Sequence, residues 1–170
     1  MHIEKIELQN FRNYKNLELE FSKNVNLILG KNAQGKTNLL EAVYLTAIGR
    51  SFRTSKDLDL VKFNENNAIV KVWAEKELNS TTVEISIKRK GEKSSEKFIK
   101  KDRKNVTKTS QLLKNILIVI FSPEDLKIVK DEPEKRRKFI DRELSQISPK
   151  YYNSLSNYKK SLLQRNTYLK

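Results

Sequence analysis

The sequence has 170 residues, of which 37% are hydrophobic and 33% are charged. It contains no cysteine, which excludes a disulfide framework and a cysteine-based metal site. Its longest apolar run, residues 116–121, is far too short for a membrane span, and no signal-peptide pattern opens the chain, so we expect a cytoplasmic protein without a membrane segment. The net charge of +14 indicates a polyanionic partner, although a lysine-rich genome would also produce it.

Two half-exposed strands are predicted near the amino end, because apolar residues alternate there with polar ones. A turn at residues 13–16 would join the two strands. The apolar segment at 25–29 predicts a third strand. The alternating residues are Ile3, Ile6 and Leu8 in the first strand and Leu17, Leu19 and Phe21 in the second.

The segment that follows residue 29 matches the pattern G-x-x-x-x-G-K-[ST] of the phosphate-binding P-loop and leads into a predicted helix at 36–48. Its backbone N–H groups must turn inward around phosphate oxygens, which explains glycine at both fixed positions. We expect ATP to bind here with Mg²⁺: Lys36 would contact the β- and γ-phosphates, and the Thr37 hydroxyl would ligate the metal ion. The expected binding residues of the loop are Gly30, Lys31, Asn32, Ala33, Gln34, Gly35, Lys36 and Thr37.

A second β region is predicted after the helix. Apolar residues alternate with polar ones at 68–74 and at 83–87, and a hairpin is predicted at 90–92. The wholly apolar run at 116–121 is typical of a strand that is covered on both faces, as in a parallel α/β sheet.

The end of the sequence predicts helices. Ser122-Pro123, Pro133 and Ser148-Pro149 each read as a helix start, since proline is favoured in the first helical turn. We therefore expect an α/β fold of the P-loop NTPase type with an antiparallel β subdomain. Residues 1–121 would form the ATP-binding lobe, and residues 122–170 would begin a helical arm.

A second acidic site for hydrolysis is not evident in the sequence. A P-loop hydrolase needs an apolar strand that ends directly in Asp or Asp-Glu to hold Mg²⁺ and align water. The nearest acids, Glu124 and Asp125, follow the run 116–121 only after Ser122 and Pro123, and they have the character of helix-start residues. No Leu-Ser-Gly-Gly type signature occurs. Catalytic residues are therefore not assigned, and nucleotide binding with almost no hydrolysis is expected of this chain.

Basic residues gather in two parts of the sequence. Ten Lys and Arg stand against three acids between residues 88 and 108, and a second cluster occupies 135–138. Such clusters suit sequence-independent contacts with DNA phosphates, although each could also be a solvated hairpin or helix face. The expected DNA-contacting residues are Lys88, Arg89, Lys90, Lys100, Lys101, Arg103, Arg136 and Arg137.

Five further segments lie in order along nearly the whole chain: Asn10-Phe11-Arg12-Asn13-Tyr14, Gly49-Arg50-Ser51-Phe52-Arg53-Thr54, Phe121-Ser122-Pro123-Glu124-Asp125-Leu126, Arg136-Arg137-Lys138-Phe139-Ile140-Asp141 and Arg165-Asn166. Together with the P-loop, these segments resemble the RecF family of bacterial recombination mediators. The resemblance implies an ABC-ATPase head-like fold related to that of structural-maintenance-of-chromosomes (SMC) proteins. It also implies a longer chain, whose other half would bring the signature motif and the Walker B acid.

For function, the resemblance implies a weak ATPase that forms an ATP-dependent homodimer on DNA at single-strand/double-strand junctions. With RecO and RecR, such a protein would help to load RecA. The resemblance also implies that Arg12 reaches the bound nucleotide, and that Arg50 and Arg53 border the nucleotide or the dimer face. The alternative is a P-loop kinase or small-molecule phosphotransferase, which would need an acceptor pocket and a complete transfer site within the chain.

Overall fold

A computed structural model describes residues 1–76, 79–121 and 132–169. These residues form two compact units, Met1–Ile116 and the part of the chain that begins at Leu117. The sequence predicted a boundary after residue 121, which is slightly further along the chain than the boundary in the structure. The P-loop lies wholly within the first unit.

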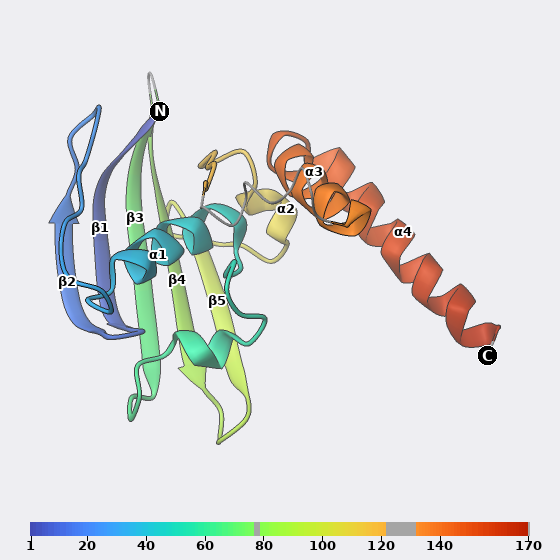
Figure 1. The fold of residues 1–170 in the computed structure, drawn as a ribbon, viewed down its shortest axis with the longest axis horizontal. Coiled ribbons are helices and arrows are strands. Elements are labelled where there is room, and N and C mark those ends of the chain that lie inside the picture. Colours follow the sequence, from blue (N-terminus) through green and yellow to red (C-terminus); the bar gives the residue numbers. More distant parts are fainter. Residues whose placement is uncertain (77–78, 122–131, 170) are drawn as a thin grey trace. The chain divides into compact units, whose positions relative to one another are not determined.

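The first unit is built on a six-stranded sheet with the order β2-β1-β3-β4-β5-β6 (Figure 1). Every pair of neighbouring strands is antiparallel, so the predicted antiparallel β subdomain is confirmed. The first turn is shorter than expected, because β2 already begins at Tyr14. The strands are β1 (His2–Phe11), β2 (Tyr14–Glu20), β3 (Asn67–Lys76), β4 (Asn79–Arg89), β5 (Ser95–Lys101) and β6 (Lys104–Asn105).

Helix α1 (Lys36–Ile48) lies across one face of this sheet and contacts β1, β3 and β4. Side chains alternate between the faces of a strand, and the residues that face α1 are buried: Ile6, Leu8, Ala68, Val70, Val72, Ala74, Val83, Ile85 and Ile87. The helix ends at Gly49 in the left-handed conformation (φ 80°), and its N–H donates to the carbonyl of Leu45 at 2.7 Å. The predicted helix at 36–48 is therefore confirmed. A 3₁₀ turn, η1 (Asp57–Leu60), and a short helix, α2 (Thr109–Leu112), complete the unit.

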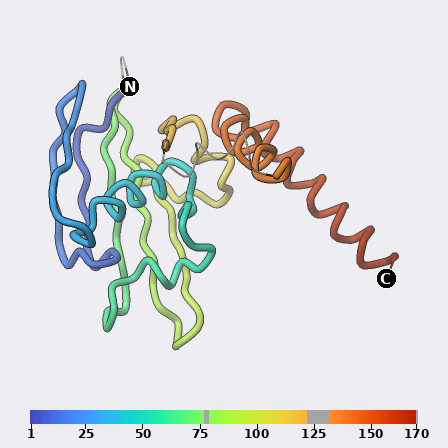
Figure 2. Tube along the Cα trace, viewed as in Figure 1, coloured from blue at the N-terminus to red at the C-terminus, as the bar shows by residue number. Residues whose placement is uncertain are grey.

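Two strands expected from apolar runs are not strands in the structure. Residues 25–29 and 116–121 pair with no strand among the described residues, and Val25 and Val119 are 84% and 77% exposed. A strand of a parallel sheet is stable only when neighbours supply ladder hydrogen bonds on its sides and cover its faces. The prediction was wrong for this chain because that cover is not provided by the residues described. Figure 2 traces the first of these segments from β2 through the P-loop into α1.

The second unit contains helices α3 (Pro133–Ile147) and α4 (Pro149–Tyr168), which confirms the two predicted helix starts at proline. The Ser148 hydroxyl caps α4 by accepting the N–H of Tyr151 at 3.2 Å. Tyr151 in turn donates to Asp141 at 2.6 Å, which joins the two helices. The helix start predicted at Ser122-Pro123 lies outside the described residues. None of the helices described has the length and apolar character needed to cross a bilayer.

Candidate nucleotide-binding site

The P-loop curls around the side chain of Lys36. The Lys36 ammonium donates to the carbonyl oxygens of Gly30 at 2.6 Å and Lys31 at 2.7 Å, which places a positive charge at the centre of the loop. Helix α1 begins at Lys36, so its free N–H groups and the positive end of its dipole lie at the same place. Thr37 is exposed in the first turn of α1. The predicted P-loop thus surrounds the Lys36 ammonium beside the N-terminus of α1, and anion binding there stays a prediction.

The turn between β1 and β2 holds the far end of the loop. Asn13 Nδ2 donates to the carbonyl of Gln34 at 3.1 Å, and the Tyr14 hydroxyl donates to the carbonyl of Gly35 at 3.2 Å. Asn38 in α1 donates to Asn13 Oδ1 at 2.8 Å. Burial raises the pKa of Tyr14, so its phenol keeps the proton that it donates. These contacts hold the loop in place through the backbone carbonyls of Gln34 and Gly35.

Gly35 is the position at which this arrangement requires glycine. Its φ is 105°, and a Cβ there would lie 2.7 Å from Asn13 Oδ1 and 3.0 Å from the Tyr14 hydroxyl. We expect Gly35→Ala to displace the β1–β2 turn from the loop and to weaken ATP binding by about tenfold or more, since strain of this kind costs about 1–3 kcal/mol. Isothermal titration calorimetry with MgATP measures the change.

Gly91→Ala is the matched control for that experiment. Gly91 has a similar left-handed φ of 82°, but a Cβ there meets nothing within 4 Å. We expect Gly91→Ala to lower stability slightly and to leave ATP affinity unchanged. Equal losses of affinity in the two variants would contradict the role of the Asn13 and Tyr14 contacts.

A buried carboxylate lies beneath the loop. Glu41 is in the second turn of α1 and is 0% exposed. It accepts two hydrogen bonds from Arg12, from Nε at 2.9 Å and Nη2 at 2.7 Å. It also accepts one from the Ser51 hydroxyl at 2.5 Å and one from Arg53 Nη1 at 3.3 Å. Glu41 therefore joins the β1–β2 turn, the P-loop helix and the segment after that helix.

Arg12, expected to reach the nucleotide, has every side-chain nitrogen engaged within the protein. Its third nitrogen, Nη1, donates to the carbonyl of Asp59 at 2.9 Å. The φ of Arg12 is 54°, a left-handed conformation that the paired carboxylate helps to hold. The structure thus places Arg12 against Glu41, one layer behind the loop. A nucleotide contact by Arg12 stays a prediction.

Arg53 carries the second positive charge on the same carboxylate. It is 44% exposed, and its Nη1 also donates to Asn38 Oδ1 at 2.6 Å, so its guanidinium lies beside the first turn of α1. Arg50 is exposed. The sequence interpretation missed Glu41, and spacing along the helix does not single it out, because residues 41–49 are all buried.

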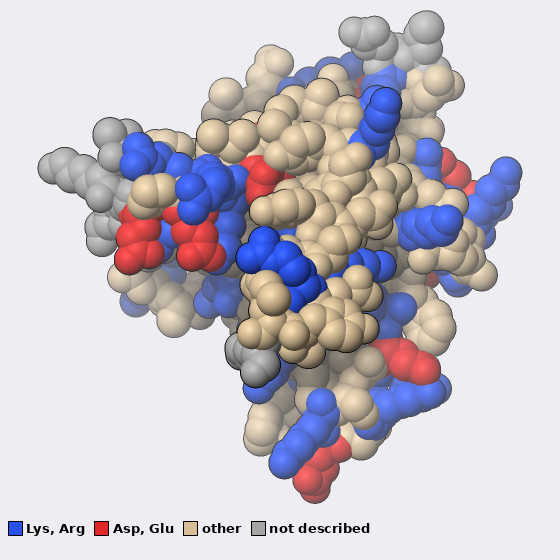
Figure 3. Space-filling model, turned by 90° about the vertical axis from the view of Figure 1, so that its right-hand side faces the viewer, with Lys and Arg blue, Asp and Glu red and all other residues tan. Residues whose placement is uncertain are grey.

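The structure separates the basic residues between 88 and 108 into two groups. Lys88, Arg89 and Lys90 lie where β4 turns into β5, whereas Lys100, Lys101 and Arg103 lie at the opposite end of β5. The two ends are about 20 Å apart at ~3.3 Å per residue. Arg136 and Arg137 are exposed on α3 in the other unit. Figure 3 shows Lys and Arg side chains dispersed over one face, with Asp and Glu beside several of them.

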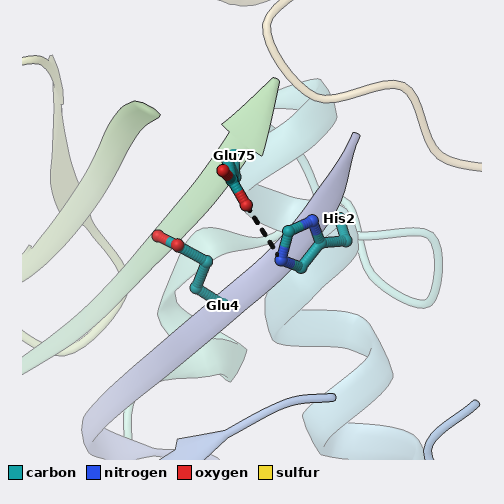
Figure 4. Close-up of side chains that lie close together, drawn as sticks. All are labelled: His2, Glu4 and Glu75. Atoms are coloured by element: carbon teal, nitrogen blue, oxygen red, sulfur yellow. Dashed lines mark ion pairs between the residues drawn. The ribbon is translucent and has the colours of Figure 1, made fainter. Parts of the chain in front are cut away.

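Among the residues described, one group of side chains has the spacing of a metal site. It consists of His2, Glu4 and Glu75, whose ligand atoms lie within 4.8 Å of one another. Figure 4 shows the His2 ring directed at Glu75, with Nε2 at 3.3 Å from the carboxylate. Lys23 also lies 3.7 Å from the same carboxylate oxygen. We describe this group as an ion-pair cluster and assign it no metal.

The comparison with known proteins supports the class of protein that this geometry indicates, a P-loop nucleotide-binding protein. A sequence model described as "AAA domain" matches residues 5–168, and the chain belongs to that family. Curated relatives named "DNA replication and repair protein RecF" match the chain over its whole length. The protein from Clostridium tetani (strain Massachusetts / E88) is 48% identical over 170 residues, which are 45% of its own length. The protein from Clostridioides difficile (strain 630) is 46% identical over the same residues, or 44% of its length.

Solved structures agree with these relatives. The recombination mediator protein RecF-ATPrS of the RecFOR pathway has a TM-score of 0.90 and 42% identity over 98% of this chain and 44% of that one. The corresponding RecF-ATP structure has a TM-score of 0.88 and 41% identity over 99% of this chain. An SMC ATPase structure at 23% identity and a TM-score of 0.63 shares the fold. The resemblance to the RecF family and the P-loop, ABC-ATPase head-like fold are thereby confirmed, and the chain spans slightly less than half the length of these relatives.

Proposed function

We propose that this chain is the ATP-binding part of a RecF-type DNA repair protein. The observation that carries the proposal is the P-loop geometry, in which Lys36 lies within hydrogen-bonding distance of the loop carbonyls at the N-terminus of α1. The similarity to RecF-ATP supports ATP as the nucleotide. The Thr37 hydroxyl is the candidate protein ligand for Mg²⁺.

DNA binding is the second part of the proposal. The net charge of +14 and the exposed basic groups on β5 and α3 support sequence-independent contacts with phosphates. From the family we further propose an ATP-dependent dimer that acts at single-strand/double-strand junctions with RecO and RecR and assists RecA. Weak ATP hydrolysis would belong to that longer assembly. In the full-length protein, ATP should raise DNA affinity and ADP should not, which a small-molecule kinase would not show.

The phosphate contacts can be tested through salt dependence. Changing Lys100, Lys101 and Arg103 together to Gln should flatten the slope of log K against log salt on duplex DNA, by about 0.9 for each phosphate that the variant no longer neutralises. Fluorescence anisotropy of labelled duplexes measures the slope, and two unrelated sequences should lose affinity equally. ATP affinity should stay as it is.

A comparison variant, Arg136→Gln with Arg137→Gln, tests α3 separately. These side chains are exposed and lie in the other compact unit. A slope that neither variant changes would place the DNA surface outside both groups and would assign the charge excess to composition.

A further inference from the structure

A groove lies on the outer face of the sheet, the face opposite to α1. It has a volume of about 520 Å³, within the range of small-ligand sites. Its walls come from three neighbouring strands and the turn after β5, because residues that alternate with the buried core residues point outward. The lining residues are Lys71, Trp73, Ser80, Thr82, Glu84, Lys100, Asp102 and Arg103.

Trp73, the single tryptophan of the sequence, forms the aromatic part of the groove. Lys71 Nζ lies 4.4 Å and Lys5 Nζ 5.2 Å from the centroid of its ring, within the range of cation–π contacts. Lys5 also pairs with Glu18 and Glu7, which raise its pKa and compensate its charge. Lys71 forms no ion pair with any carboxylate that the structure describes. Its ammonium lies over the ring, so a ligand stacked on Trp73 would displace it and would keep its positive charge as a neighbour.

The rim of the groove beside β5 and β6 carries excess positive charge. Lys100 and Arg103 line the groove there with one acid, Asp102, whereas Lys101 lies opposite the buried Val83 and so belongs to the other face of the sheet. That acid, Asp102, already accepts the Thr82 N–H at 2.8 Å and the Thr81 hydroxyl at 3.1 Å. The Lys100 ammonium lies 3.8 Å from Glu84, a loose pair that solvent screens. An anion at this rim would therefore meet Lys100 and Arg103.

We propose that this groove binds single-stranded DNA, with one base stacked on Trp73 and the adjoining phosphates against Lys100 and Arg103. Trp73 is half-buried, and an aromatic ring with cations beside it is the arrangement by which proteins hold single strands. The bases of a duplex are stacked on one another and cannot lie on an indole ring, so Trp73 distinguishes the single strand from the duplex. The inference rests on the proposed DNA-binding function and locates the single-strand contact within it.

Because Trp73 is the single tryptophan of this sequence, its fluorescence reports binding at the groove. Titration of the full chain with a short oligothymidine should quench the Trp73 fluorescence, with saturation. Trp73→Ala should weaken binding to oligothymidine, measured by anisotropy of a labelled strand, by about 5- to 150-fold, which is the range for loss of one base–aromatic stack. Trp73→Phe retains a ring for stacking and should recover most of the affinity. Phe63→Ala, at an aromatic residue 86% exposed in the loop before β3, should leave the affinity unchanged.

Two further measurements distinguish a failure of the groove proposal from a failure of the proposed DNA-binding function. On duplex DNA, Trp73→Ala should have no effect, while Lys100→Gln with Arg103→Gln should weaken binding. Normal single-strand binding by Trp73→Ala would overturn the groove and leave DNA binding standing, whereas a chain that binds neither form of DNA would overturn both. Oligoglutamate that quenches Trp73 as strongly as oligothymidine would show that the groove recognises acidic chains in general and would also overturn the proposal.

Discussion

Lys36→Ala is expected to reduce MgATP affinity by about 150-fold, because a hydrogen bond to a charged group contributes up to about 3 kcal/mol. The ammonium is the cation that the loop encloses, within 2.7 Å of two of its carbonyls. Without it, those carbonyl dipoles would repel the β- and γ-phosphates. Calorimetric titration with MgATP measures the loss.

Lys56→Ala is the control for that experiment. Its side chain is exposed and lies outside the loop, and its hydrogen bonds to Thr54 and Asp59 are formed by its backbone. The variant should bind ATP nearly as the parent does. A folded Lys36→Ala variant with parental affinity would refute the P-loop as the nucleotide site.

Glu41→Ala is expected to destabilise the first unit by about 3–5 kcal/mol, the range for removal of one partner from a buried ion pair. The change would leave the half-buried Arg12 guanidinium without its carboxylate and would release the Ser51 hydroxyl. Because native domains are stable by only about 5–15 kcal/mol, much of the chain would unfold at moderate temperature. Urea unfolding followed by circular dichroism measures the loss.

Arg53→Gln is the matched control for Glu41→Ala. Its ion pair with Glu41 is longer, at 3.3 Å, and the side chain is 44% exposed, so we expect a loss of no more than about 1 kcal/mol. A loss as large as that of Glu41→Ala would show that the carboxylate depends equally on both arginines. A small loss in both variants would show that the buried cluster contributes little to stability.

Local sequence patterns were sufficient to predict the helix at 36–48 and the strands of the antiparallel sheet. The helix at 36–48 has its own hydrogen bonds, many apolar residues and Gly49 at its end, and the strands of the sheet show clear alternation, as at 83–87. The segments 25–29 and 116–121 could not be judged in the same way. Whether they form strands depends on hydrogen-bond partners that no local pattern specifies.

The site was predictable where a motif fixes the backbone and not where contacts are distant. The P-loop residues are adjacent in sequence, and Gly35 and Lys36 are diagnostic in themselves. The partnership of Glu41 with Arg12 spans 29 residues, and the sequence does not show which arginine meets which acid. Likewise, the antiparallel β4–β5 hairpin placed Lys88 and Lys101 at opposite ends of a strand, although composition had grouped them together.

The extended segment at 25–29 has a consequence for nucleotide affinity. On one side the P-loop is anchored by α1 and by the contacts of Asn13 and Tyr14, but on the other side it continues into a segment without a ladder of hydrogen bonds to the strands described. Hydrogen bonds with Ser22 hold only Val25 and Asn26 at the start of this segment. A ligand that holds the whole loop in one conformation would also restrict the remaining residues, at up to about 1–2 kcal/mol for each residue fixed. A partner strand that fixed residues 25–29 beforehand would remove that entropic term and tighten ATP binding without touching the nucleotide. Pairing of this segment and occupancy of the P-loop would then be thermodynamically linked, each favouring the other.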